Sequence, residues 1–270
     1  MPNKAHGGSL ISDAKLKELY ASMLRNRLVA EHARRLRKRG AAAFYQASMG
    51  QEALITGCAI DLLPGDEVVD TVAPNPSPAA LLNGTRVKKI VAQLESRSSQ
   101  NPAPQQQLTS ATTLAEANKA KNGSVVVVFA SAMKGGLKNL RGALTSAVGQ
   151  SLPMIFVVEN NPWSAKLRGY KNLKSEREGL TSITVDGNDV VAVYRVAHEA
   201  LERVRQAGGP VLIEGKTYRQ DGRSPVAVER DPLVRMEQYL AAKGLFSLRW
   251  KNSLMRKLTR ELATAVVAKA

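Results

Sequence analysis

The sequence predicts an α/β fold in three layers, with a mostly parallel central sheet and helices on both faces. The prediction rests on the stretch Ser124–Trp163. Two short β-branched runs, Val125–Phe129 and Met154–Val158, lack the polar alternation of a half-exposed strand, as expected of strands buried on both faces. Between them, apolar residues recur at helical spacing up to Gly149. Strand, helix and strand in this order form a βαβ unit, and such a unit requires a parallel sheet.

The rest of the chain repeats this alternation of helical and extended patterns. Apolar periodicity predicts helices over 12–40, 49–63, 79–83, 87–94, 111–121, 190–206, 232–243 and most of 246–269. Short apolar or β-branched runs bounded by turn residues predict strands over 67–71, 182–185 and 211–218. Ser12 and Asp189 precede helical patterns and are expected to cap them.

The length and the cysteine content limit the domain organisation. We expect residues 1–270 to form one domain, with a polar N-terminal tail over 1–11 and a low-complexity loop over 96–109 that is rich in Ser, Gln and Pro. The single cysteine, Cys58, excludes an internal disulfide and a cysteine-cluster metal site. Its apolar neighbours predict a buried, hydrophobic thiol.

The chain carries a formal net charge of +16, which attracts anions such as nucleic acids, phosphorylated cofactors, acidic lipids or acidic proteins. The densest basic block is Arg34–Arg39. Aromatic residues make up only 4% of the chain and none interleaves with this block, which argues against nucleic acid as a partner. The block is interpreted as a solvated last helical turn, where cations complement the macrodipole.

No stretch approaches the roughly 18 apolar residues that a membrane span needs. The polar N-terminus also lacks a signal-peptide core. We therefore expect no membrane partner and a cytoplasmic location.

Several short motifs occur in a fixed order along the chain. They are Gly50-Gln51-Glu52-Ala53, Leu63-Pro64-Gly65-Asp66, Leu152-Pro153, Val157-Val158-Glu159-Asn160-Asn161, Val185-Asp186-Gly187-Asn188-Asp189, Gly209-Pro210-Val211-Leu212-Ile213-Glu214, Thr217-Tyr218-Arg219 and Asp231-Pro232. No single motif is specific. The ordered set, however, resembles the alpha subunit of the thiamine-diphosphate-dependent 2-oxo acid dehydrogenases, the first component of the pyruvate and branched-chain complexes.

The resemblance implies a thiamine-diphosphate-binding fold and the oxidative decarboxylation of a 2-oxo acid, with a disulfide as acceptor. It implies thiamine diphosphate and Mg²⁺ as cofactors. It also implies a beta-type subunit as partner in a hetero-oligomer, and an acyltransferase core as a further partner.

The same resemblance locates the diphosphate site. In the family, the Asp of a G-D-G motif, a later Asn and a backbone carbonyl hold the Mg²⁺ that binds the diphosphate. The G-D-G positions correspond to residues 131–133, the Asn to Asn161 and the carbonyl to Trp163. The carboxylate is replaced by Ala132, which supplies no side-chain oxygen. The candidate cofactor-binding residues are Ala132, Met133, Lys134, Asn161 and Trp163; Asn161 is the candidate metal ligand, and no catalytic residue is assigned.

Other family landmarks are replaced as well. Val72-Ala73 stands where the resemblance expects a Tyr-Arg pair that approaches the cofactor. The glycine-rich, His-containing segment expected before the central strand is reduced to residues 96–109, and a second expected histidine falls near Arg223. These losses predict an impaired or non-catalytic homologue, so whether the chain is an enzyme stays open.

Two alternatives remain. In the first, the chain is an active thiamine-diphosphate dehydrogenase subunit with a non-standard site, in which Lys134 pairs with the diphosphate where the helix after Gly135-Gly136 begins. A solvated loop lysine is the plainer interpretation of Lys134. In the second, the chain is a basic protein that binds nucleic acid or another polyanion.

Overall fold

The computed structural model describes residues 11–39, 49–71, 87–95, 103–121, 123–131, 136–160, 180–218 and 230–267. The helices and strands follow in this order: α1 (Asp13–Lys38), α2 (Glu52–Ala59), β1 (Glu67–Asp70), α3 (Val87–Glu95), α4 (Pro104–Lys121), β2 (Val126–Ser131), α5 (Gly136–Gly149), β3 (Met154–Asn160), β4 (Thr181–Asp186), α6 (Val190–Arg205), β5 (Val211–Lys216), α7 (Pro232–Ala242) and α8 (Leu248–Val267). The predicted helix over 79–83 lies outside the described residues.

The described strands form one sheet in the order β1-β2-β3-β5-β4, and every neighbouring pair is parallel. The two strands that predicted the fold lie beside each other, with Val126 opposite Met154. Both strands have fully buried centres, and Val127 and Val157 are 0% exposed. The predicted βαβ unit and parallel sheet are therefore confirmed.

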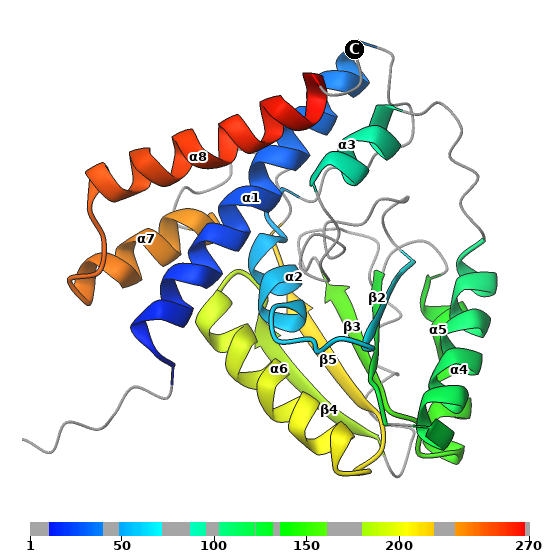
Figure 1. Ribbon diagram of the computed structural model, residues 1–270. Coiled ribbons are helices and arrows are strands. Elements are labelled where there is room, and N and C mark those ends of the chain that lie inside the picture. The colour runs from blue at the N-terminus through cyan, green and yellow to red at the C-terminus, as the bar shows by residue number, and fades with distance from the viewer. Residues whose placement is uncertain are drawn as a thin grey trace, which may run out of the picture.

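Helices cover both faces of the sheet (Figure 1). Along the order β1-β2-β3-β5-β4, the connection through α5 leads from β2 forward to β3. The connection through α6 leads the other way, from β4 back to β5. Because such crossovers are almost always right-handed, they place α5 and α6 on opposite faces. Helix α4 joins α5 against one face, and α2 joins α6 against the other. This arrangement confirms the predicted three-layer α/β fold.

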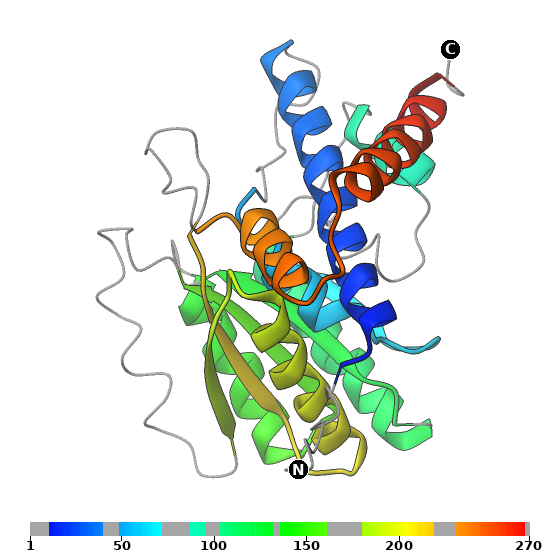
Figure 2. The same ribbon diagram turned by 90° about the vertical axis from the view of Figure 1, so that its left-hand side faces the viewer.

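A further group of helices, α1, α7 and α8, packs on the outside of the α2 and α6 layer, and α1 lies between the other two (Figure 2). Tyr20 of α1 is fully buried at the centre of this group. Its hydroxyl donates to Glu237 Oε1 at 2.7 Å, and its ring lies 5.4 Å from that of Trp250. The expected cap of α1 is present, because the Ser12 hydroxyl accepts from the Lys15 backbone N–H.

The structure corrects two boundaries. Helix α4 begins at Pro104, so residues 104–109 of the predicted loop are helical. Proline is favoured at the first helical position, and the Ala103 backbone N–H donates to Gln106 Oε1 at 3.2 Å, which satisfies a donor at the helix start. Leu108 then anchors this first part of α4 in the core. Ile11, placed in the polar tail, is also buried.

None of the helices in the described part of the chain is long and apolar enough to cross a membrane. The cytoplasmic location stays a prediction.

Cys58 is 2% exposed in α2, which confirms the predicted buried thiol. Burial raises its pKa well above the ordinary value, because the thiolate would lie in an apolar core. The native protein is therefore expected to resist alkylation by iodoacetamide at pH 8, and to react at one site only after unfolding in urea. Mass spectrometry measures both states, and rapid labelling of the folded protein would contradict the burial.

The close approach of α2 and α6 gives a stability prediction. A Cβ at Gly57 would lie 2.6 Å from Val193 Cγ1 and 2.9 Å from the Tyr194 backbone nitrogen. Gly57→Ala is expected to lower the free energy of unfolding by about 1–3 kcal/mol, because the helices must move apart. A Cβ at Gly142 in α5 would meet no other atom within 4 Å, so Gly142→Ala is expected to be neutral or stabilising by up to about 1 kcal/mol. Urea denaturation compares the two, and equal effects would contradict the predicted crowding.

Candidate functional site

The candidate site lies at the edge of the sheet where the parallel strands end. Ligands of open α/β sheets bind beyond the carboxyl ends of the strands, where the connections turn to opposite faces. Here β2 ends at Ser131 and the adjacent β3 ends at Asn160. In the sequence, the two predicted ligand stretches, 132–134 and 161–163, directly follow these two strand ends. The residues themselves, Ala132, Met133, Lys134, Asn161 and Trp163, lie outside the described part of the chain.

Polar side chains join the strand ends on both faces of the sheet. On one face, the Asn160 amide donates to Glu214 Oε1 at 2.7 Å and the Thr184 hydroxyl donates to Glu214 Oε2 at 2.9 Å. On the other, the Thr217 hydroxyl donates to Glu159 Oε1 at 3.1 Å. Both carboxylates are buried, which favours such pairing because an unpaired buried carboxylate is costly. These bonds fix the end of β3, from which residues 161–163 continue.

Asn188 ties three loops together beyond these strand ends. It lies in the turn between β4 and α6, where its amide donates to the Gly50 carbonyl at 2.8 Å and its Oδ1 accepts from the Tyr218 N–H at 2.7 Å. The preceding Gly187 allows the turn to approach β5, because a Cβ there would lie 2.6 Å from Thr217 Cγ2. The loops before α2, after β4 and after β5 are therefore held in one arrangement.

Glu52 extends this arrangement to the outer helices. It is 0% exposed, and its carboxylate accepts from the Gly50 N–H at 2.9 Å and from Arg27 Nε at 2.5 Å. The Arg27 guanidinium also donates to both oxygens of Asp231, at 3.0 and 3.2 Å, and Asp231 caps α7. Burial lowers the pKa of Arg27, but the charges of Glu52 and Asp231 and the hydrogen bonds that Arg27 donates to both carboxylates raise it by more, so the net shift is upward. We call Arg27, Glu52, Asp231, Gly50 and Asn188 the Glu52 network.

The Glu52 network brings together motifs that are far apart in the sequence and that carry the family resemblance. Three members of the network, Glu52, Asn188 and Asp231, belong to three of these motifs, and each makes a hydrogen bond that positions backbone. Tyr218 of a fourth motif joins the network through its N–H, which donates to Asn188. Asp66 of a fifth motif acts likewise, accepting from the N–H groups of Leu63 and Val125. Glu52, Asn188 and Tyr218 therefore hold loops at the carboxyl edge of the sheet, whereas Asp66 holds the amino ends of β1 and β2 at the opposite edge.

Sequence reasoning missed Arg27, the central cation of the network. A signal was present, because Arg27 follows Met23 and Leu24 at the spacing of the apolar face of α1. A charged residue on an apolar helical face predicts a buried ion pair.

Within the described residues, no group of three or more His, Cys, Asp or Glu side chains is placed to hold a metal ion. Two acidic side chains near this edge, Glu159 and Glu214, are hydrogen-bonded: Glu159 to Thr217, and Glu214 to Asn160 and Thr184.

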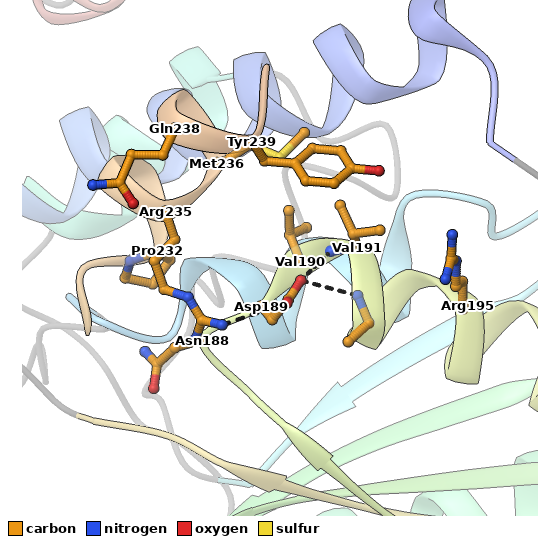
Figure 3. A pocket seen from close by; sticks show the side chains of 11 residues that line it. Asn188, Asp189, Val190, Val191, Arg195, Pro232, Arg235, Met236, Gln238 and Tyr239 are labelled. Atoms are coloured by element: carbon orange, nitrogen blue, oxygen red, sulfur yellow. Dashed lines mark hydrogen bonds and ion pairs between the residues drawn. The ribbon is translucent and has the colours of Figure 1, made fainter. Parts of the chain in front are cut away.

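A separate pocket of about 460 Å³ lies between the start of α6 and α7 (Figure 3). Two of its charged side chains have partners: Asp189 accepts from the N–H groups of Val191 and Ala192, and Arg235 pairs with Asp186 at 2.7 Å and Asp189 at 3.4 Å. The other arginine of the lining, Arg195, is exposed and lies far from Arg235 in Figure 3. An anion would compete with these internal partners, so the pocket is a poor diphosphate site.

The Glu52 network gives a prediction about stability. Arg27→Ala leaves the buried Glu52 and the half-buried Asp231 without their cation, and the free energy of unfolding is expected to fall by about 3–5 kcal/mol. The control on the same helix is Arg25→Ala, which removes a more exposed ion pair with Glu261 at 3.5 Å and is expected to cost less than about 1 kcal/mol. Thermal and urea unfolding measure both. A loss for Arg27→Ala no larger than the control would contradict a central role for the network.

Comparison with known proteins is consistent with this geometry. The family described as "Dehydrogenase E1 component" matches residues 112–269. The pyruvate dehydrogenase E1 component subunit alpha of Staphylococcus epidermidis is 26% identical over 289 residues, covering 95% of this chain and 78% of that protein. The corresponding protein of Staphylococcus aureus is 25% identical with the same coverage. That of Porphyra purpurea is 35% identical over 143 residues, covering 46% of this chain and 42% of that protein. The family match spans more than half of the chain, which therefore belongs to the dehydrogenase E1 component family and resembles its alpha subunits.

Proposed function

We propose that the chain is a 2-oxo acid dehydrogenase alpha-subunit homologue that keeps the fold and has lost most or all of the family's catalytic activity. The observation that carries this proposal is the alanine at position 132, where the resemblance places the carboxylate that binds Mg²⁺. The family reaction depends on thiamine diphosphate, and Mg²⁺ attaches the diphosphate to the protein. A chain without that ligand binds the cofactor weakly.

The residues in this stretch do not fit Mg²⁺. The ion requires oxygen ligands in nearly octahedral geometry, usually including a carboxylate. Ala132 offers no side-chain ligand, Met133 offers a thioether, and Lys134 places a positive charge next to the site. A unit charge pair about 4 Å apart is worth about 4 kcal/mol at an effective dielectric of about 20. Loss of one such interaction corresponds to about three powers of ten in affinity.

The retained and replaced motifs differ in what their side chains do. The retained Glu52, Asn188 and Asp231 hold loops and helices together through hydrogen bonds. The replaced positions, at 72–73, at 132 and near 223, are those that the resemblance assigns to the cofactor site. None of the replaced positions belongs to the Glu52 network. This contrast supports a scaffold without standard catalysis.

The proposed partner is a beta-type dehydrogenase subunit. The Staphylococcus and Porphyra relatives are each named as a subunit alpha of a pyruvate dehydrogenase E1 component. In such assemblies the resemblance places thiamine diphosphate between unlike subunits, so the isolated chain is an incomplete test of cofactor binding. An acyltransferase core is the further partner that the same resemblance suggests.

Calorimetric titration of thiamine diphosphate with Mg²⁺ tests the proposal, using the chain alone and mixed with a candidate beta subunit. The chain is expected to show no metal-dependent binding in either case. Ala132→Asp restores the missing oxygen ligand and is expected to increase metal-dependent affinity at least about ten-fold. Met133→Asp adds the same charge at the neighbouring position and is expected to give no such gain.

Tight, Mg²⁺-dependent binding by the unchanged chain would overturn the proposal. Failure of Ala132→Asp to gain affinity would contradict the assignment of position 132 as the lost ligand. Metal-independent binding that Lys134→Ala abolishes would instead favour an active subunit with a non-standard diphosphate site.

A further inference from the structure

Helix α8 has two opposite faces of different chemistry. One face packs on α1, α3 and α7 through Leu258, Leu262 and Ala265, which are 3–7% exposed. The opposite face carries Arg249, Arg256 and Arg260, all exposed. At 100° per residue, these three arginines fall within about 20° of a line pointing directly away from Leu258. In Figure 1, α8 forms an outer edge of the molecule. We call these three arginines the α8 ridge.

The side chains around the α8 ridge are small or polar. Ser253 and Ala263 lie within about 40° of the same line, and both are exposed. The arginines are therefore the longest side chains on this face. From Arg249 to Arg260 they span about 16 Å along the helix axis. A second helix could therefore approach closely between the guanidinium groups.

No acidic residue of α8 compensates these charges. The one carboxylate of the helix, Glu261, faces α1 and pairs with Arg25 at 3.5 Å. Arg256 and Arg260 are four residues apart, a spacing at which like charges destabilise a helix. A solvated helical face ordinarily mixes both signs. The ridge is therefore a concentration of one charge that an external anionic partner would stabilise.

We propose that the α8 ridge is a docking surface for an acidic amphipathic helix of another protein. Guanidinium groups bind carboxylates through paired hydrogen bonds, and three of them in line on one helix match glutamates repeated along one face of a partner helix. The ridge lacks exposed aromatic side chains, which single-stranded nucleic acid would use for base stacking. It also lies along a straight helix, the shape that a second helix packs against. This inference does not depend on the proposed function.

Fluorescence anisotropy with the full chain tests the docking surface. The probe is a labelled alanine-based helical peptide with glutamates at three- and four-residue spacings on one face. A peptide of the same composition, with its glutamates spread around the helix, is the control probe. The chain is expected to bind the first peptide at least about ten-fold more tightly than the second, and the affinity is expected to fall as salt rises from about 50 to about 200 mM.

Two charge-reversal variants locate the binding. Arg256→Glu/Arg260→Glu changes the ridge and is expected to weaken binding at least about ten-fold. Arg141→Glu/Arg203→Glu makes the same change in net charge on the exposed faces of α5 and α6, and is expected to weaken it less than about two-fold. Circular dichroism checks that both variants stay folded.

Three results would overturn the proposal. Equal losses in the two variants would show that net charge alone attracts the peptide. Equal binding of the two peptides would show that no helical face is recognised. Tighter, ridge-dependent binding of a DNA duplex of about 20 base pairs, or of vesicles containing phosphatidylserine, would assign the ridge to a different class of partner.

Discussion

The buried ion pairs of Arg27 support much of the remaining structure. Arg27 comes from the first helix, Glu52 from the second and Asp231 from the cap of α7, so one guanidinium joins three helices. Glu52 also binds the Gly50 N–H, and the Gly50 carbonyl binds Asn188 at the end of β4. A buried charge is tolerated only when it is paired and hydrogen-bonded, so these groups favour one arrangement of helices and loops.

This constraint separates fold from activity. Residues of the Glu52 network hold the loops at the carboxyl edge, whereas the proposed ligands of a metal-bound diphosphate are other residues. Under the proposed assignment, the alanine at position 132 takes an oxygen ligand from the diphosphate site, and position 132 is not part of the network. The proposed loss of cofactor affinity is therefore compatible with an intact sheet and its helices. For that reason fold alone does not establish activity here.

Much of the fold was predictable from the sequence, because buried parallel strands such as Val125–Phe129 give apolar runs without alternation. The loop prediction for residues 104–109 was wrong because it relied on local composition, which is rich in Gln. Tertiary packing decides instead: Leu108 is buried and anchors α4. Arg27 was missed because its partners are distant in sequence and only the fold brings them together. The predicted ligands at 132–134 and 161–163 lie outside the described residues, and their assignment stays a prediction.

The most direct test of lost catalysis is turnover of 2-oxo acids by the chain reconstituted with a candidate beta subunit, in the presence of thiamine diphosphate and Mg²⁺. Reduction of an artificial electron acceptor can be followed for pyruvate and for branched-chain 2-oxo acids. The proposal predicts no rate above that of the beta subunit alone, even where gel filtration shows that the two chains assemble. Cofactor-dependent turnover by the assembled pair would contradict it and establish a working active site.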